Sequence, residues 1–209
     1  PELFNNLLDL YPLFLRHGIL TILESILHRK ELRNCHKVYM YTNNSCSPHW
    51  PDLIHQYINY KLNTTKFFDR TICAFKVGNK IIEPLRTTND KTHSDFIRCT
   101  LLPKSTEICF IDNSYYNKMV HDKIYYIQPK SYYHGMLNSQ IIDVLLGSDV
   151  LNNHLLKNIE ENVKGNIKRD ISIEINARCN NYKPKPYIET EYDVKVAEKL
   201  LYYINDYFI

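Results

Sequence analysis

The sequence predicts an α/β fold in which a mainly parallel sheet is flanked by helices and followed by a C-terminal appendage. Short runs rich in β-branched and aromatic residues alternate with segments whose apolar residues recur every three or four positions. Polar residues cluster directly after the first and third of these runs, where open parallel sheets place their binding sites. The 209 residues are enough for one such domain with a tail.

Each element is predicted from its own local pattern. Helical spacing of apolar residues predicts helices at residues 3–27, with a break at Tyr11-Pro12, and at residues 48–62, 90–99 and 138–146. Strands are predicted at residues 36–42, 71–75, 107–112 and 123–127, with a hairpin turn and return strand at 77–82. Alternating strands and helices favour parallel pairing.

The composition changes after Gly147 to a polar stretch rich in Asn and Lys. The strict alternation of ISIEI at residues 171–175 predicts a strand, a Lys-Pro-Lys-Pro linker follows at 183–186, and residues 194–208 have helical spacing. We therefore expect an α/β domain over residues 1–146. Residues 147–209 are interpreted as a C-terminal extension with a possible strand and a terminal docking helix.

The composition excludes several classes of protein. Hydrophobic residues make up 44% and charged residues 23%, which is typical of a globular chain, and no apolar run reaches the roughly 20 residues of a membrane span. A net charge of +3, with no coherent basic stripe and no P-loop, makes nucleic acid an unlikely partner. The six cysteines lack zinc-site spacing and predict reduced thiols in an intracellular compartment.

Two polar positions after predicted strands are candidate site residues. Thr42 and Asn43 end the first strand, where a hydroxyl and turn amides can bind an anion, although capping of the turn is the more common role for such a threonine. Asp112 and Asn113 end the third strand, and their oxygens suit Mg²⁺; an ordinary strand-ending turn is the equally weighted alternative.

Cationic residues lie between these strands in RTTNDKTHSDF. Lys91 and Arg86 could offset the negative charge of a transferring phosphoryl group, although a solvated lysine is the more common outcome. Four histidines share no ligand spacing and are interpreted as surface or capping residues: His49, His93, His121 and His134.

The order YTNN, FFDRTICAF, RTTNDKTHSDF, EICFIDNS and KIYYI resembles the haloacid-dehalogenase-like (HAD) superfamily, whose sheet is of Rossmann type. Within it, the chain is most similar to phosphatases acting on the C-terminal domain of RNA polymerase II, and in particular to such proteins of large DNA viruses. The resemblance covers residues 10–146, and its most specific motif is Asp112-Asn113, where other HAD members have Asp-Asp.

The resemblance implies roles for individual residues. Thr42 would bind a phosphoryl oxygen with Asn43 beside it, and Asp112 with Asn113 would hold Mg²⁺. The family's lysine is expected at Ser94 by spacing, so Lys91, one helical turn earlier, would serve only through its longer reach. The implied partner is a phosphorylated substrate, such as a phosphoprotein, in the host cytoplasm or nucleus, or in a virion.

One family motif is missing. HAD phosphatases begin with a strand ending in DxDxT, which supplies the nucleophile and the general acid, and no DxD occurs in this sequence. We expect that motif upstream of Pro1. The resemblance implies that this strand lies between those ending at Thr42 and Asp112, so its absence would leave two unpaired edges. An N-terminal segment, a partner chain or residues 171–175 could complete the sheet, or the sheet is rearranged.

Two functions remain open. The first is a Mg²⁺-dependent phosphomonoesterase that works through an aspartyl-phosphate, provided that the missing motif exists. The second is a non-catalytic pseudophosphatase or structural protein, such as a viral particle component. The absent DxD and Ser94 at the expected lysine position favour the second. Activity on nucleic-acid ends has less support.

Overall fold

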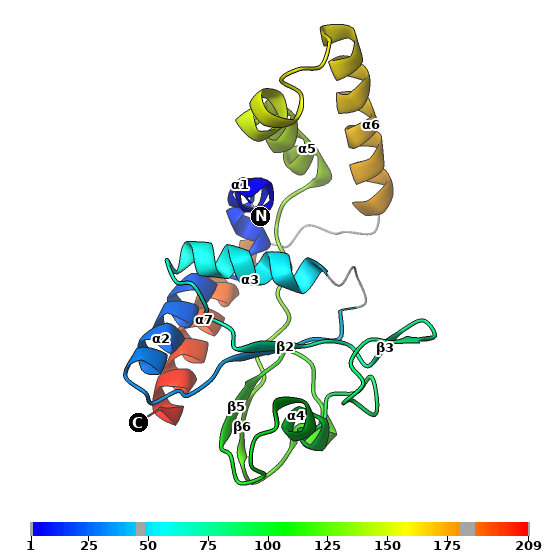
Figure 1. Cartoon of the computed structure of the whole chain (residues 1–209). Coiled ribbons are helices and arrows are strands. Elements are labelled where there is room, and N and C mark those ends of the chain that lie inside the picture. The colour runs from blue at the N-terminus through cyan, green and yellow to red at the C-terminus, as the bar shows by residue number, and fades with distance from the viewer. Residues whose placement is uncertain (1, 45–48, 180–186, 209) are drawn as a thin grey trace. The chain divides into compact units, whose positions relative to one another are not determined.

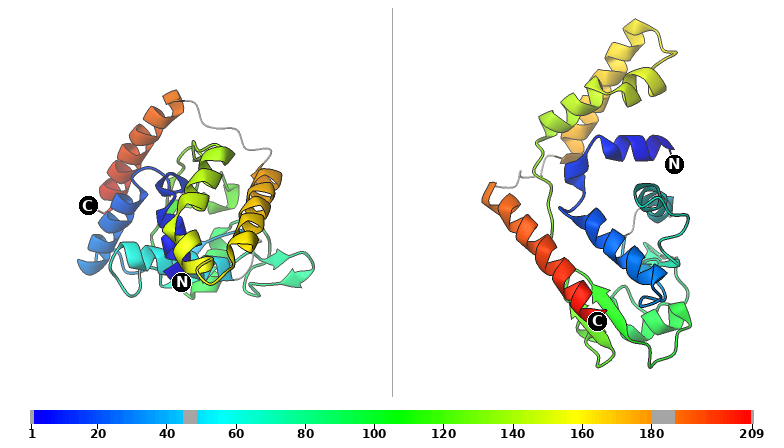
Figure 2. Two further views of the ribbon diagram at one scale, coloured as in Figure 1. Left: turned by 90° about the horizontal axis from the view of Figure 1, so that it is seen from above. Right: turned by 90° about the vertical axis from the view of Figure 1, so that its left-hand side faces the viewer.

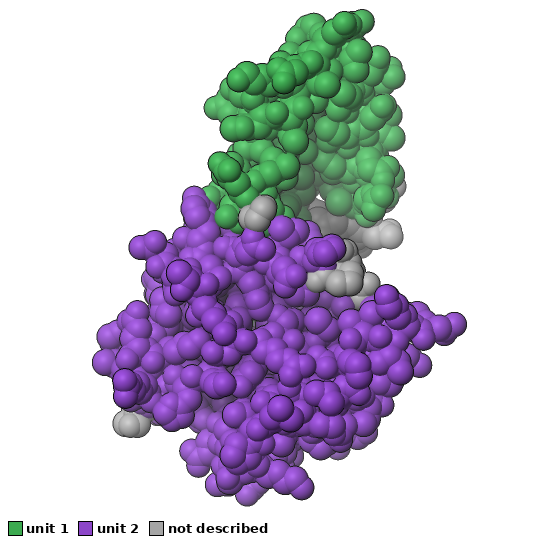
Figure 3. All heavy atoms as spheres, in the orientation of Figure 1, with its two compact units in different colours: residues 1–17, 132–194 green, residues 18–131, 195–209 purple. Residues whose placement is uncertain are grey.

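The computed structural model describes residues 2–44, 49–179 and 187–208, with the side chains of 187–190 excepted (Figure 1). The chain forms two compact units, one of residues 1–17 and 132–194 and the other of residues 18–131 and 195–209 (Figure 3). These units group the residues differently from the expected segments 1–146 and 147–209, which stay a prediction. The expected linker at residues 183–186 lies outside the described residues.

The second unit contains all the strands that the structure describes. Its helices are α2 (Ile19–Glu31), α3 (His49–Lys61), α4 (His93–Thr100), the 3₁₀ turn η2 (Asn117–Met119) and the C-terminal part of α7 (Tyr187–Tyr207). Its strands are β1 (Tyr39–Tyr41), β2 (Arg70–Ile72), β3 (Lys76–Val77), β4 (Lys80–Ile81), β5 (Ile108–Ile111) and β6 (Ile124–Ile127). The predicted strands and helices of this region are therefore confirmed, most with shorter bounds.

Parallel pairing is also confirmed, but the sheet is divided. Strand β1 pairs in parallel with β2, β5 pairs in parallel with β6, and β3 with β4 forms the predicted antiparallel hairpin. Within the described residues β1 and β5 each pair on one side only, so the expected single sheet is replaced by two parallel pairs. The unit is therefore mixed α/β with short parallel strand pairs.

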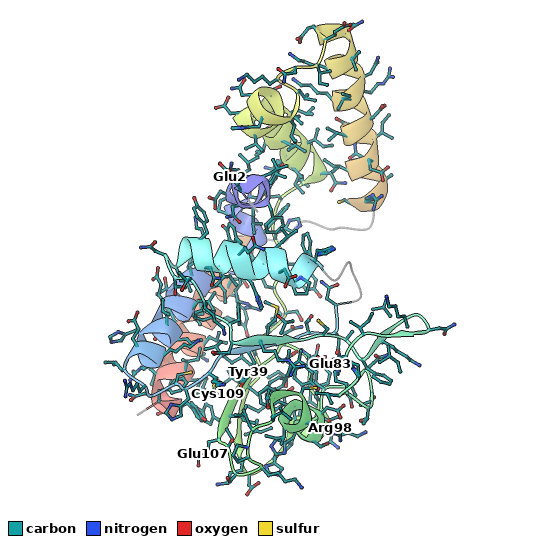
Figure 4. The ribbon with its side chains drawn as sticks, in the orientation of Figure 1. Glu2, Tyr39, Glu83, Arg98, Glu107 and Cys109 are labelled. Atoms are coloured by element: carbon teal, nitrogen blue, oxygen red, sulfur yellow. The ribbon has the colours of Figure 1, made fainter. Side chains whose placement is uncertain are left out.

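Helices cover both faces of the β5–β6 pair. Phe110 of β5 and Tyr41 of β1 pack with Phe96 of α4 in one buried cluster. The alternate residues of β5, including Cys109 (labelled in Figure 4), contact a second cluster formed by α2, α7 and Ile127 of β6. Because successive side chains of a strand point to opposite faces, this apolar strand is buried on both sides.

The C-terminal helix packs along α2, as the expected docking helix would (Figure 2). Gly18 begins α2 with φ +70°, and a Cβ at that position would lie 3.0 Å from the Cβ of Ala197 on α7. Glycine at position 18 therefore allows both the left-handed backbone conformation and the close approach of α7 to α2. Further along the two helices, the hydroxyl of Ser25 donates to Asn205 Oδ1 at 3.1 Å.

The first unit is helical. It contains α1 (Glu2–Asp9), the 3₁₀ turn η1 (Pro12–Phe14), α5 (Asn138–Gly147), the π-helical turn η3 (Val150–Leu155) and α6 (Glu161–Cys179). Pro12 begins η1, so the predicted break after Tyr11 is confirmed. The Tyr11 hydroxyl donates to the carbonyl of Ile141 at 2.8 Å and thereby joins this break to α5.

The strand predicted at residues 171–175 is wrong, because these residues lie inside α6. Ile171 and Ile175 also belong to a four-residue repeat with Ile167, which places the three side chains on one half-buried face of the helix. Ile173 is 59% exposed. Alternation over five residues was too short a pattern to outweigh helical spacing over the whole segment.

This arrangement predicts different costs for two neighbouring substitutions. Ile171→Asp should lower the free energy of unfolding by about 1 kcal/mol more than Ile173→Asp, because only Ile171 is on the half-buried face. Urea denaturation followed by circular dichroism measures the difference. A strand at residues 171–175 would place both side chains on the same face and make the two costs equal.

Among the described residues, no helix is both long and apolar enough to cross a membrane. The five cysteines in the described parts of the chain form no disulfide, and Cys46 lies outside them. Cys99 is fully buried, and burial raises the pKa of its thiol to about 11. Cys73 and Cys109 are partly exposed.

Candidate functional site

The predicted site residues follow the carboxyl ends of two strands in the second unit. The amide of Thr42 donates to the carbonyl of Ile72 at 2.9 Å, and the amide of Asp112 donates to Ile127 at 3.2 Å, so each parallel ladder extends to the candidate residue itself. The Thr42 hydroxyl accepts a hydrogen bond from the amide of Asn44 at 3.0 Å. Thr42 therefore caps the turn, and its hydroxyl proton can still be donated to a ligand.

A buried ion pair occupies the end of β5. The ammonium of Lys91 lies 2.5 Å from Asp112 Oδ2, and the two side chains are only 9% and 10% exposed. The other carboxylate oxygen of Asp112 accepts from the amide of Ser114 at 2.8 Å. Both oxygens of this carboxylate are thus engaged within the protein.

Aromatic rings surround the ammonium of Lys91. It lies 5.5 Å from the ring centroid of Tyr41, 5.9 Å from that of Phe110 and 5.4 Å from that of Tyr116. Each ring face attracts a cation, and the apolar rings limit water at the ion pair. Burial raises the pKa of Tyr41 to about 12, so its hydroxyl remains protonated at neutral pH.

Tyr116 joins the two strand ends. Its hydroxyl lies near the side chains of Asn43, which follows β1, and Ser114, which follows β5, and both act to lower its pKa. Burial raises the pKa of Tyr116, and the negative charge of Asp112 raises it further. The structure therefore brings Asn43, Lys91 and Asp112 to one site, and Thr42 lies next to Asn43 in the chain.

Arg86 is engaged by backbone groups. Its guanidinium donates to the carbonyls of Thr42 (3.2 Å) and Cys73 (2.7 Å), and to those of Asn89 (3.1 Å) and Asp90 (3.0 Å). The side chain is 2% exposed and its Nε has no hydrogen-bond partner among the described residues. Arg86 thus ties the ends of β1 and β2 to the loop that carries Lys91.

Ser94, where the resemblance places the family's lysine, contributes no charge. Ser94 is exposed, and its hydroxyl lies 3.4 Å from that of Thr92. Lys91 is the residue whose side chain contacts Asp112. Asn113, in contrast, is not part of the ion pair. Its side-chain amide N–H donates to the hydroxyl of Ser131 at 2.9 Å.

The described residues do not by themselves complete a magnesium site. Mg²⁺ is usually held by one or two carboxylates together with substrate phosphate, in near-octahedral geometry. Asp112 offers one carboxylate whose oxygens already accept from Lys91 and Ser114. Among the residues that the structure describes, no group of three or more acidic, histidine or cysteine side chains could hold a metal. A further carboxylate or a bound phosphate would have to complete the coordination.

Sequence reasoning missed two residues of this site. Tyr41 lies one position before Thr42. Both Arg86 and Lys91 lie over its ring, at 4.8 and 5.5 Å from the centroid, and its hydroxyl accepts from the amide of Thr92 at 3.3 Å. Tyr116 comes four residues after Asp112 in an irregular segment. Alternation along β1 could have placed Tyr41 on a buried face, but no local pattern marks Tyr116.

The strand ends carry a hydroxyl, an ammonium and turn amides, which are the kinds of group that bind oxyanions in proteins. It lacks a second carboxylate positioned as a nucleophile among the described residues. Comparison of the chain with protein-family models, with curated proteins and with solved structures finds no significant match.

Proposed function

We propose that the second unit is a HAD-like, phosphatase-type domain whose site binds the phosphoryl group of a phosphomonoester. The buried Lys91–Asp112 pair is the observation that carries this proposal. The Lys91 ammonium would neutralise phosphoryl charge, and the Thr42 hydroxyl would donate to a phosphoryl oxygen. Arg86 would hold both in place through the backbone, and a phosphoprotein is the proposed substrate.

Hydrolysis would need a carboxylate that these 209 residues do not supply in a DxD motif. In the proposed route, the first aspartate of a DxDxT motif attacks phosphorus, the alcohol leaves with a proton from the second aspartate, and water then releases phosphate. Lys91 and Thr42 would stabilise the phosphoryl oxygens through both steps. Magnesium stays a proposal tied to the same added carboxylate.

The divided sheet supports a missing strand. The amide of Thr42 donates to β2 and the amide of Asp112 donates to β6. Because neighbouring residues of a strand direct their backbone groups to opposite sides, the backbone groups of Tyr41 and Ile111 point to the other edges of β1 and β5. Two-stranded parallel sheets are rarely stable alone, and both pairs contribute to one buried cluster with α4. We propose that a strand from an N-terminal segment or a partner chain pairs with β1 and β5. Residues 171–175 are not that strand, since they are helical.

The test uses protein expressed from its full native reading frame. We expect hydrolysis of 4-nitrophenyl phosphate in Mg²⁺ and not in EDTA. The turnover should fall on the order of 10²-fold in Lys91→Met and in Asp112→Asn, with Lys104→Met as the exposed control. Binding of inorganic phosphate is followed by ³¹P NMR, and circular dichroism confirms that each variant is folded.

The outcomes separate the alternatives. Unchanged turnover in Asp112→Asn would refute its assignment as a site residue. A folded protein that neither turns over the substrate nor binds phosphate would refute the phosphoryl site altogether.

The second candidate is a non-catalytic pseudophosphatase or structural protein, such as a component of a viral particle. The absence of any DxD from the sequence is the observation that favours it. It predicts that the full native protein also lacks DxDxT, binds no Mg²⁺ by calorimetry and has no turnover. An intracellular location stays a prediction under both candidates.

A further inference from the structure

Two histidines that are distant in sequence have their rings in contact in the second unit. His93 is the first residue of α4, and His121 lies in the loop between η2 and β6. Their ring centroids are 4.0 Å apart with an interplanar angle of 37°. The Nε2 atom of His93 is buried and has no hydrogen-bond partner in the described parts of the chain. Both residues were expected to be unrelated surface or capping residues, and tertiary structure brings them together.

The surroundings of this pair favour a neutral His93. Burial lowers the pKa of His93, and the proximity of His121 lowers it further, while Asp122 raises it. The position at the N-terminus of α4 also disfavours a positive charge, because the helix dipole is positive there. Nearby, Asp122 Oδ1 lies 2.7 Å from His121 Nδ1, and the side chain of Lys123 pairs with Glu107.

A proton added to each ring strains the pair. His121 has Asp122 as a counter-ion, but His93 has no acceptor for an added proton on Nε2. Two imidazolium rings at this distance repel each other, and the charge on the partly buried His93 ring is poorly hydrated. Separation of the rings would relieve both costs.

The histidine pair is connected to Lys91 through the residues that begin α4. Thr92 caps α4 by accepting from the amide of Asp95 at 3.0 Å, and its own amide donates to the Tyr41 hydroxyl. Lys91 is the preceding residue, so the N-terminus of α4 cannot move without moving the residue that pairs with Asp112. Arg86 binds the carbonyl of Asn89 before Lys91, and the contact between the two histidine rings lies after it.

We propose that His93 and His121 form a proton-operated latch: when both rings are charged, the N-terminus of α4 separates from the 120–123 loop and the Lys91 segment loosens. The effect of pH on the stability of the fold has a definite direction. A histidine whose folded pKa lies below its unfolded value costs no stability above pH 6.5, and it destabilises the fold progressively as the pH falls below that value. The latch is therefore closed at neutral pH and open in acid. It does not depend on whether the site binds phosphate.

The first test measures thermal stability at pH 7.5 and pH 5.0. The melting temperature of the unmodified protein should fall on acidification by roughly 3 °C more than that of His93→Gln or His121→Gln. His36→Gln, at an exposed position, should behave like the unmodified protein. Equal falls in all four proteins would overturn the proposal.

The second test follows the histidine rings themselves by NMR and remains informative if His93→Gln folds poorly. His93 should titrate at a higher pH in His121→Gln than in the unmodified protein, because the neighbouring charge is gone. The backbone amides of Lys91 and Thr92 should exchange faster at pH 5.0 only when both histidines are present. An unchanged His93 titration, or exchange at these amides that is independent of the histidines, would contradict the latch.

Discussion

Replacement of Arg86 by methionine is expected to lower the free energy of unfolding by about 3–5 kcal/mol. The guanidinium is buried and donates to four backbone carbonyls that belong to the ends of β1 and β2 and to the loop before Lys91. An acceptor left without a donor costs about 1–3 kcal/mol when buried, and these four carbonyls are partly buried, so relaxation and water recover some of the total. Urea denaturation monitored by circular dichroism measures the loss.

Two further variants make this result specific. Arg86→Lys keeps the charge but replaces a planar guanidinium with a single ammonium, which has three donors and cannot span all four carbonyls, so it should recover only part of the loss. Arg169→Met, at an exposed position of α6, should change stability by no more than about 0.5 kcal/mol. A cost below about 1 kcal/mol in Arg86→Met would show that these hydrogen bonds do not hold the strand ends.

The Lys91–Asp112 pair should give the second large effect, seen most clearly in a double-mutant cycle. Lys91→Met or Asp112→Leu alone should cost about 3–5 kcal/mol, because each leaves one buried charge without its partner. The double variant should be less destabilised than either single variant, since it removes both charges from a site already lined by aromatic rings.

The cycle is measured from urea denaturation midpoints of the four proteins. A matched cycle on Lys164 and Glu161, a pair at 3.0 Å on α6 whose glutamate is exposed, should give a coupling of no more than about 1 kcal/mol. Additive costs for Lys91 and Asp112 would mean that the two side chains do not interact in solution, and the proposed phosphoryl site would lose its main support.

Both predictions concern the contacts that hold Lys91 in place. Arg86 binds the carbonyl of Asn89 before Lys91, the His93 and His121 rings are in contact after it, and both Arg86 and Lys91 lie over the Tyr41 ring. Lys91 is thereby held against Asp112 before any ligand arrives. A cation held in this way loses little conformational freedom on binding an anion, which is the physical basis of preorganised electrostatic sites.

Part of the candidate site followed from the sequence. Residues that come directly after hydrophobic strands are fixed in place by strand pairing, and for this reason the positions of Thr42 and Asp112 could be predicted. The choice between Lys91 and Ser94 could not be made from spacing. A loop that precedes a helix can direct a side chain either way, and the structure directs Lys91 inward and leaves Ser94 exposed.

The sequence by itself determined most local structure in the second unit, because strands, hairpin and helices there each have a period that matches their own geometry. It failed at residues 171–175, where five alternating residues also fit the face of a longer helix. Only the tertiary structure decided that β1–β2 and β5–β6 are separate pairs, that Arg86 binds backbone carbonyls, and that His93 meets His121. Those contacts join residues far apart in the chain, and a local pattern carries no information about which distant group will satisfy a buried charge or an unpaired strand edge.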